Sequence, residues 1–260
     1  MAQDKPVVIA VLGLGEAGSA IAGDLVRAGA VVRGYDPAVR APDGIVETTS
    51  EADAVTGADL VLSVNRSAAA IDAMRNGIGA LRERGVWADL NTASPGKKQE
   101  LADLAKQHNA AFADIAIMAP VPGRGLRVPM LVSGQAAGPA AEILRDLGAS
   151  IELLDGEAGV AATRKLLRSV FFKGMSTAIV EALEAARAAG YEDLLRANIT
   201  SELAAADEST VERIVSGTYQ HAERRADEMA AAAEMLTELG VRPSMAAASR
   251  DVHLRLTGKG

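Results

Sequence analysis

Residues 7–36 read VVIAVLGLGEAGSAIAGDLVRAGAVVRGYD, and this stretch decides the fold. The apolar, β-branched run at residues 7–12 is typical of a short buried strand. A helical pattern follows, and residues 30–34 indicate a second strand that ends at Asp36. The turn between the first strand and the helix carries a G-x-G-x-x-G pattern formed by Gly13, Gly15 and Gly18. The glycines alone are a weak signal, but in this strand–turn–helix–strand context they predict a dinucleotide-binding unit.

Each glycine has a separate role in such a unit. Gly13 permits the tight turn, Gly15 lets a pyrophosphate approach the backbone, and Gly18 lets the helix pack closely on the strand. Free N–H groups at the start of the helix, together with its dipole, favour phosphate binding. The predicted cofactor-binding residues of this turn are Gly13, Leu14, Gly15, Glu16, Ala17 and Gly18.

Asp36 occupies the position expected to contact the ribose. Its carboxylate can accept hydrogen bonds from both ribose hydroxyls and would repel a 2′-phosphate, which favours NAD over NADP. Arg33 and Arg40 are close enough in sequence to keep NADP possible. Glycines that serve only a tight strand-to-helix turn are the alternative, but they would not account for an acid at this position.

The composition of the chain excludes several classes of function. Its 260 residues are 49% apolar and carry a net charge of −7, and no basic block favours nucleic acid or an anionic membrane as a partner. There is no cysteine and the three histidines are scattered, so thiolate chemistry is excluded and a protein-held metal is not expected. Because no signal-peptide pattern or membrane-length apolar stretch occurs, we expect a cytoplasmic protein.

Strand and helix patterns alternate through the first part of the chain and then stop. Strand patterns near residues 59–64, 85–90, 111–117, 129–133 and 150–154 alternate with helical ones, which predicts an α/β fold with a Rossmann-type, doubly wound parallel sheet. After residue 156 only helical patterns remain, at about 160–190, 192–205, 209–239 and 243–256. We predict an NAD(P)-binding Rossmann domain over residues 1–156 and a smaller, all-helical domain for substrate binding and dimerisation over residues 157–260.

Ligands of open α/β sheets bind beyond the carboxyl ends of the strands. This rule selects residues after three successive strand patterns: Asn65 and Arg66, then Asn91, Thr92 and Ser94, then Met118. A nucleotide site joined to a helical domain implies hydride transfer. That reaction needs one group to move a proton, and donors to polarise the reacting oxygen or nitrogen.

Lys165 is the main candidate for the group that moves the proton. It lies on the first long helical pattern of the second domain, among small and apolar neighbours. Partial desolvation there would lower the pKa of its amine toward the working range. Lys173 follows about two turns later, and Arg168 suits a substrate carboxylate. From spacing alone, an ordinary cationic surface on an amphipathic helix is the alternative.

Four segments, in order, resemble the β-hydroxyacid dehydrogenase family, which includes 3-hydroxyisobutyrate and tartronate semialdehyde dehydrogenases and is related to 6-phosphogluconate dehydrogenase. VLGLGEAGSAIAGDL is similar to its cofactor signature, and ADLNTASP at residues 88–95 to its substrate loop. FADIAIMAPVPGRG at residues 112–125 falls on its strand with a serine–glycine–glycine turn, and residues 159–165 fall on the stretch with its catalytic lysine. Residues 165–174 and 221–229 resemble a poorly characterised branch with a 6-phosphogluconate-dehydrogenase-like C-terminal domain.

The resemblance implies a role for each candidate residue. Lys165 would be the general acid/base and would act with Asn91 and Thr92, while Asn65 and Arg66 would lie beside the cofactor. The substrate would be surrounded by Ser94, Met118, Arg168, Ser169 and Lys173. A homodimer is also implied.

Two residues depart from the family pattern. Met118, followed by Ala119 and Pro120, replaces the serine–glycine–glycine turn, and Ser169 replaces an asparagine expected one turn after the lysine. The segment at residues 116–118, AIM, resembles the corresponding segment of imine reductases.

We therefore expect an NAD(P)-dependent dehydrogenase that transfers a hydride between the nicotinamide and a small, acidic hydroxy acid or sugar acid. A reductase of C=N bonds with the same architecture is the first alternative. A protein that binds the nucleotide without turnover is the second.

Overall fold

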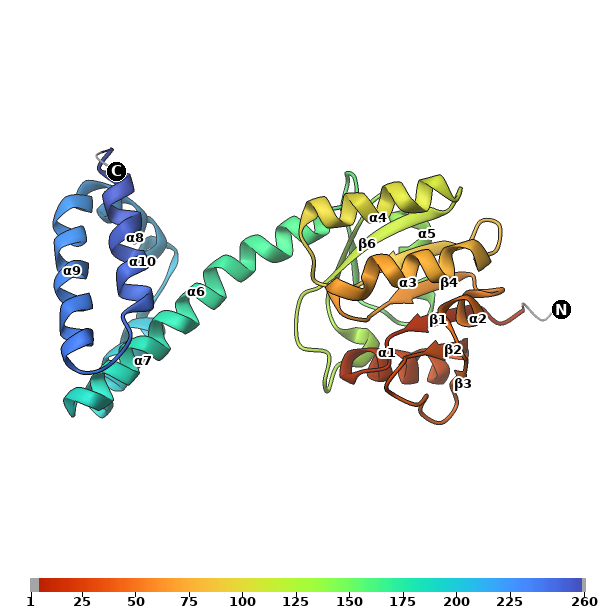
Figure 1. Ribbon diagram of the computed structural model, residues 1–260, viewed down its shortest axis with the longest axis horizontal. Helices are drawn as coiled ribbons and strands as arrows, with labels where there is room; N and C mark the ends of the chain where they lie inside the picture. The colour runs from red at the N-terminus through yellow and green to blue at the C-terminus, as the bar shows by residue number, and fades with distance from the viewer. Residues whose placement is uncertain (1–4, 259–260) are drawn as a thin grey trace. The chain divides into compact units, whose positions relative to one another are not determined.

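A computed structural model describes residues 5–258 (Figure 1). The chain divides into two compact units, with the boundary after Arg168. The first unit contains one sheet flanked by helices, and the described part of the second unit is helical. Among residues 5–258, no helix combines the length and apolar character needed to cross a bilayer.

The first unit is built on an eight-stranded sheet in the order β3-β2-β1-β4-β5-β6-β7-β8. The strands are β1 (Val8–Leu12), β2 (Val31–Tyr35), β3 (Val46–Glu47), β4 (Leu60–Ser63), β5 (Val86–Asp89), β6 (Ala111–Ile117), β7 (Met130–Ser133) and β8 (Ile151–Leu153). Neighbouring strands from β3 to β6 are all parallel. These six strands have the 3-2-1-4-5-6 order of a doubly wound dinucleotide-binding sheet, which confirms the predicted fold class.

The last two strands differ in direction from the parallel sheet that the sequence predicted. β7 pairs with β6 in antiparallel fashion, and β8 is parallel to β7. The connection from β6 to β7 contains only a short 3₁₀ turn, η3 (Gly125–Arg127). A parallel pair would need a crossover connection with a full helix, so this connection returns the chain antiparallel.

Helices cover both faces of the sheet. Alternate residues of β1 point to opposite sides, so Ile9 and Val11 belong to one buried cluster while Ala10 and Leu12 belong to another. The first cluster includes residues of α1 (Glu16–Arg27) and α5 (Ala137–Asp146). The second includes residues of α2 (Glu51–Val55), α3 (Ala70–Gly77) and α4 (Pro95–Gln107). Burial on both faces explains why these strands read as continuous apolar runs.

Helix α6 (Val160–Ala189) begins in the first unit and continues into the second. Ala161, in its first turn, is fully buried in a cluster with Ala116, Leu131 and Leu154. The compact division consequently falls inside α6 rather than at residue 156, where the strand patterns of the sequence end.

The second unit comprises the remainder of α6 with α7 (Glu192–Ala205), α8 (Glu208–Gln220), α9 (Ala222–Glu238) and α10 (Ser244–Leu256). The sequence predicted one helix over residues 209–239, and this was wrong. The backbone leaves the helical conformation at His221, with φ −118° and ψ 27°, and separates α8 from α9.

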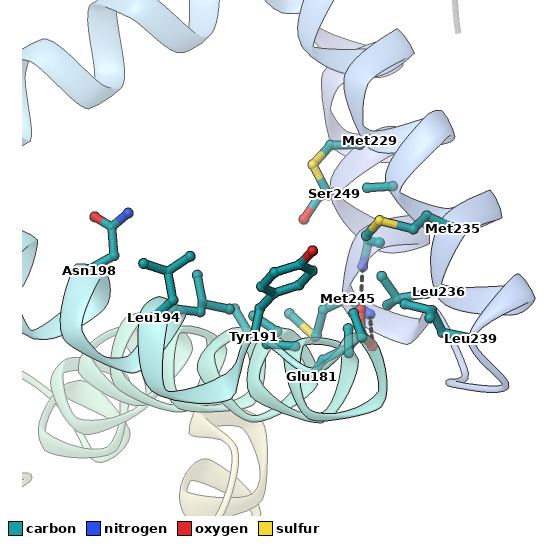
Figure 2. Close-up of a pocket in the computed structure, with 18 residues that line it drawn as sticks. Glu181, Tyr191, Leu194, Asn198, Met229, Met235, Leu236, Leu239, Met245 and Ser249 are labelled. Atoms are coloured by element: carbon teal, nitrogen blue, oxygen red, sulfur yellow. Dashed lines mark hydrogen bonds between the residues drawn. The ribbon is translucent and has the colours of Figure 1, made fainter.

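An apolar groove of about 530 Å³ lies within the second unit. Figure 2 shows Tyr191, which precedes α7, and Leu194 of α7 on one side, with Met229 and Met235 of α9 on the other. Buried Glu181 of α6 lines the groove and accepts hydrogen bonds from the Met245 and Ala246 N–H groups at 2.7 and 2.8 Å. The carboxylate thereby caps the start of α10.

Candidate functional site

The turn between β1 and α1 is closely packed at two glycines and open at the third. Gly13 has a φ of +100°, and a Cβ there would lie 2.8 Å from the backbone nitrogen of Asn65. A Cβ on Gly18 would lie 1.9 Å from the Gly13 carbonyl oxygen. By contrast, nothing lies within 4 Å of a Cβ built on Gly15. Free space beside this backbone is what a pyrophosphate needs.

The start of α1 has no side-chain cap. Gly15 is the N-cap residue, and no side chain forms a capping hydrogen bond there. The backbone amides of Glu16 and Ala17 therefore lie at the positive end of the helix dipole, where anions bind. The Leu14 N–H is engaged, because it donates to Asp36 Oδ2 at 2.8 Å. This end of α1 fits the phosphates of a dinucleotide.

Asp36 follows β2 and is held by backbone amides. The N–H groups of Ala38 and Val39 donate to its Oδ1 at 2.8 and 3.0 Å, in addition to the Leu14 N–H on Oδ2. Each carboxylate oxygen can accept more than one hydrogen bond, so lone pairs remain for the hydroxyls of a ribose.

The charged side chains that line the cleft beside Asp36 are mostly acidic. Asp36, Asn65 and Arg66 line one cleft of about 430 Å³, next to Gly13 and Gly15. Two further carboxylates, Glu51 and Asp72, line the same cleft. Carboxylates therefore outnumber the one arginine in this lining.

Arg33 and Arg40, the two arginines that kept NADP possible as the cofactor in the sequence analysis, have different surroundings. Arg33 donates to the Asp53 carboxylate at 2.8 Å and to the Ala54 carbonyl at 3.2 Å, so its guanidinium is engaged by α2. The Thr49 N–H and the Arg33 guanidinium hold the pKa of Asp53 below its ordinary value, which keeps this pair ionised. Arg40 is exposed in the segment after β2.

A buried polar network joins the carboxyl ends of β4 and β5. Asn91 Nδ2 donates to Asp89 Oδ2 at 2.6 Å, to Asn65 Oδ1 at 2.8 Å and to Ser63 Oγ at 3.1 Å. Two residues selected from the sequence, Asn65 and Asn91, are thus brought into direct contact. Because Asn65 also lines the nucleotide cleft, the network connects that cleft to the loop after β5.

The network continues into a buried ion cluster. Lys98 of α4 is 1% exposed, and its Nζ lies 2.6 Å from Asp89 Oδ1 and 3.0 Å from Asp114 Oδ1. Nζ also donates to the Asp89 carbonyl at 2.8 Å. A buried ammonium is tolerated only when it is paired, and here two carboxylates from adjacent strands surround it.

Asp114 connects this cluster to the start of α6. Its Oδ2 accepts hydrogen bonds from the Gly159 and Ala162 N–H groups, both at 3.0 Å. Gly159 has a φ of +101°, and a Cβ there would lie 3.0 Å from the Pro95 carbonyl oxygen, so the close approach of this segment to the start of α4 requires glycine. Half-buried Lys165 follows on α6 and lines one tightly packed pocket with Asn91, Thr92, Lys98 and Asp114, whose side chains leave no room for a water-sized molecule in this structure.

The other predicted substrate residues have varied surroundings. Ser94 caps α4, and its Oγ accepts the Lys97 N–H at 3.3 Å. Met118 packs against the small apolar cluster around Ala161, and its carbonyl accepts a hydrogen bond from Arg168 Nη1 at 3.3 Å. Ser169 and exposed Lys173 lie on α6 in the second unit.

Sequence reasoning missed four residues of the network: Ser63, Asp89, Lys98 and Asp114. A signal was present for the two acids, because each interrupts an otherwise apolar strand pattern. Lys98 shares a helical face with Leu101 and Ala105, both buried, so its position on α4 is a core position. A lysine there is unusual unless a carboxylate faces it.

Comparisons with known proteins agree with this geometry. Residues 8–153, more than half of the chain, match the family model described as the NAD binding domain of 6-phosphogluconate dehydrogenase. Residues 186–256 match a domain of unknown function, DUF1932. A probable 3-hydroxyisobutyrate dehydrogenase from Mycobacterium tuberculosis (strain ATCC 25618 / H37Rv) is 28% identical over 191 residues, which cover 70% of this chain and 65% of that relative. The chain belongs to the β-hydroxyacid dehydrogenase family.

Solved structures place this family member among proteins of the same architecture. A conserved hypothetical protein from Sinorhizobium meliloti 1021 is 30% identical, with 96% of this chain and 88% of that chain covered and a TM-score of 0.63. An imine reductase from Myxococcus stipitatus in complex with NADP⁺ is 19% identical over 97% of this chain and 95% of that chain, with a TM-score of 0.79. The second likeness shows a shared fold. The β-hydroxyacid dehydrogenase membership makes this chain an NAD(P)-dependent oxidoreductase.

Proposed function

We propose that this β-hydroxyacid dehydrogenase uses NAD to oxidise or form a small hydroxy acid or sugar acid, with Lys165 as the general acid/base. The observation that carries the proposal is the shared pocket of Lys165, Asn91 and Thr92, joined through Asn65 to the nucleotide cleft. A proton-transfer group and polar side chains beside a cofactor cleft are the parts that alcohol oxidation needs.

The turn after β1 would hold the cofactor. The backbone from Gly13 to Gly18 would bind the pyrophosphate, Asp36 the ribose, and Asn65 with Arg66 the remaining wall of the cleft. When bound, the nicotinamide supplies the hydride acceptor or donor of the reaction. The charge of the cleft supports NAD as the preferred form.

Lys165 would move the proton of the reacting hydroxyl. As a neutral amine, its Nζ would take the hydroxyl proton in the oxidative direction, and as an ammonium it would return the proton in reduction. Ala162 and Leu166 line the same pocket and provide an apolar surface next to the amine. An acidic substrate group would be bound by Arg168, whose guanidinium suits a carboxylate.

A substrate screen tests the proposal. Purified protein is mixed with NAD or NADP and a panel of hydroxy acids and sugar acids, and the absorbance of the reduced nicotinamide is followed. Turnover of an acid with NAD, lost in Lys165→Met, is the expected result. If no acid reacts but NADH still binds, the proposed reaction is wrong and a binding protein without turnover becomes the better description.

A second candidate is the reduction of C=N bonds. Met118 replaces the family's serine turn and packs into an apolar cluster with Ala116 and Leu131, so hydroxyl donors for a carboxylate are missing at this point. Turnover of cyclic imines with NADH or NADPH, together with none of hydroxy acids, would select this activity.

The second unit would form a homodimer. Several large apolar side chains of this unit are exposed, including Leu194, Val211 and Tyr219 at 65% or more, and the groove of Figure 2 is lined mainly by apolar residues. Exposed apolar surface of this kind is typical of subunit interfaces. Sedimentation equilibrium should give twice the mass of one chain, and a monomer at micromolar concentration would contradict the assignment.

A further inference from the structure

The side-chain amide of Asn91 has its two ends in very different surroundings. Its Nδ2 faces three oxygens, those of Asp89, Asn65 and Ser63, at 2.6 to 3.1 Å. Its Oδ1 is buried and has no hydrogen-bond partner among residues 5–258. The residue as a whole is 5% exposed. A buried acceptor without a donor is uncommon in folded proteins and calls for a functional explanation.

The orientation of this amide is determined by Asp89. If the amide were reversed, its oxygen would lie 2.6 Å from Asp89 Oδ2, an oxygen that has no proton to donate when ionised. Asp89 is in turn fixed by Lys98, whose Nζ bonds to its other oxygen at 2.6 Å. The ion cluster thus keeps the nitrogen of Asn91 on the protein side, so this amide has no N–H left for a substrate carboxylate.

We propose that Asn91 Oδ1 is an acceptor reserved for an N–H or O–H donor on a bound reactant. Asn91 lines the pocket of Lys165 and Thr92, so the donor would be either the carboxamide of the nicotinamide or the hydroxyl of the substrate. Lys98 and Asp89 act as positioning residues, because they hold the amide in the orientation that selects a donor. The substrate half of this inference rests on the proposed function, whereas the cofactor half requires nucleotide binding alone.

Asp89→Asn is the variant that tests the orientation. An asparagine at residue 89 has one oxygen, which Lys98 would engage, so its NH₂ would face Asn91 and favour reversal of that amide. The reversed Asn91 would present N–H groups to the reactant in place of an acceptor. Asp103→Asn removes the same charge from the exposed face of α4 and serves as the control.

The probes are two pairs that differ in a hydrogen-bond donor. NADH is compared with reduced 3-acetylpyridine adenine dinucleotide, in which a methyl ketone replaces the carboxamide. In the presence of NADH, which cannot react with a hydroxy acid, 3-hydroxypropionate is compared with propionate, which lacks the hydroxyl. Affinities come from fluorescence titration or calorimetry, so the result is independent of turnover.

We expect Asp89→Asn to weaken the donor-bearing member of one pair by about 10-fold while its partner is unchanged. Loss for NADH alone identifies the carboxamide, and loss for 3-hydroxypropionate alone identifies the substrate hydroxyl. Asn91→Leu, which removes the acceptor but keeps the ion pairs of Lys98 with Asp89 and Asp114, should give the same pattern and replaces Asp89→Asn if that variant does not fold. Wild-type affinities for both pairs in the folded variants would overturn the proposal, even if turnover of a hydroxy acid has been found.

Discussion

The buried ion cluster makes one substitution far more costly than its neighbour in sequence. Lys98→Met keeps the length of the side chain but removes the ammonium that lies 2.6 Å from Asp89 and 3.0 Å from Asp114. Two carboxylates, each at most 1% exposed, would remain without their counter-charge. Removing one partner from a buried ion pair typically costs about 3–5 kcal/mol, and a loss of this size is expected here.

The matched control is Lys97→Met. Lys97 lies one residue earlier and pairs with Glu100 at 3.3 Å, with both side chains at least one-third exposed. Partly exposed ion pairs contribute little, so the change in unfolding free energy should stay within about 0.5 kcal/mol. The two variants remove the same group at adjacent positions, and the difference between them measures the burial of the cluster.

Urea unfolding followed by Trp87 fluorescence provides the assay. Trp87 is the only tryptophan in the chain, and it is fully buried in β5, two residues before Asp89. With a slope of about 2 kcal/mol per molar urea, a loss of about 4 kcal/mol would lower the midpoint by about 2 M. A Lys98→Met midpoint equal to that of Lys97→Met would refute the description of the cluster.

Three further results should follow. Gly18→Ala should lower the urea midpoint of the first unit, because its Cβ would lie 1.9 Å from the Gly13 carbonyl oxygen. Gly15→Ala should keep the wild-type urea midpoint and lose NADH affinity, since nothing lies within 4 Å of its Cβ in the protein. Equal midpoints for the two variants would contradict this. Asp36→Ser should raise the affinity for NADPH relative to NADH in fluorescence titrations, because it removes a carboxylate from the 2′ position, and an unchanged ratio would exclude Asp36 as the discriminating residue. Hydrogen bonds from Arg187 and then Arg196 lower the pKa of Glu192 to about 2, so its contribution to stability is complete above its ordinary value of 4.5 and is lost as the pH falls toward 2. The stability difference between wild type and Glu192→Gln should therefore shrink over that range in urea titrations, and a difference that grows would contradict the assignment.

The nucleotide-binding turn and its flanking elements could be predicted from the local sequence. Strand, glycine turn and helix follow one another within residues 7–36, and each has a short-range signal that depends on backbone geometry. The contact between Asn65 and Asn91 could be anticipated as well, since parallel strands place their carboxyl ends at one edge of the sheet.

Features that depend on contacts distant in sequence were not predictable in this way. The direction of β7 depends on what its connection contains, and the break at His221 has no proline or glycine at the site to indicate it. Lys98 reads as a surface residue until Asp89 and Asp114 are brought to it from adjacent strands. The orientation of the Asn91 amide is likewise fixed by oxygens from three other residues, and no pattern of spacing encodes it.

The measurement closest to the central claim compares wild type with Lys165→Met in both turnover and NADH binding. The account predicts that the variant loses about 10²- to 10⁴-fold in kcat with the substrate found in the screen, while its dissociation constant for NADH stays within about 2-fold. Turnover by Lys165→Met at the wild-type rate would contradict the role of Lys165 as the group that moves the proton.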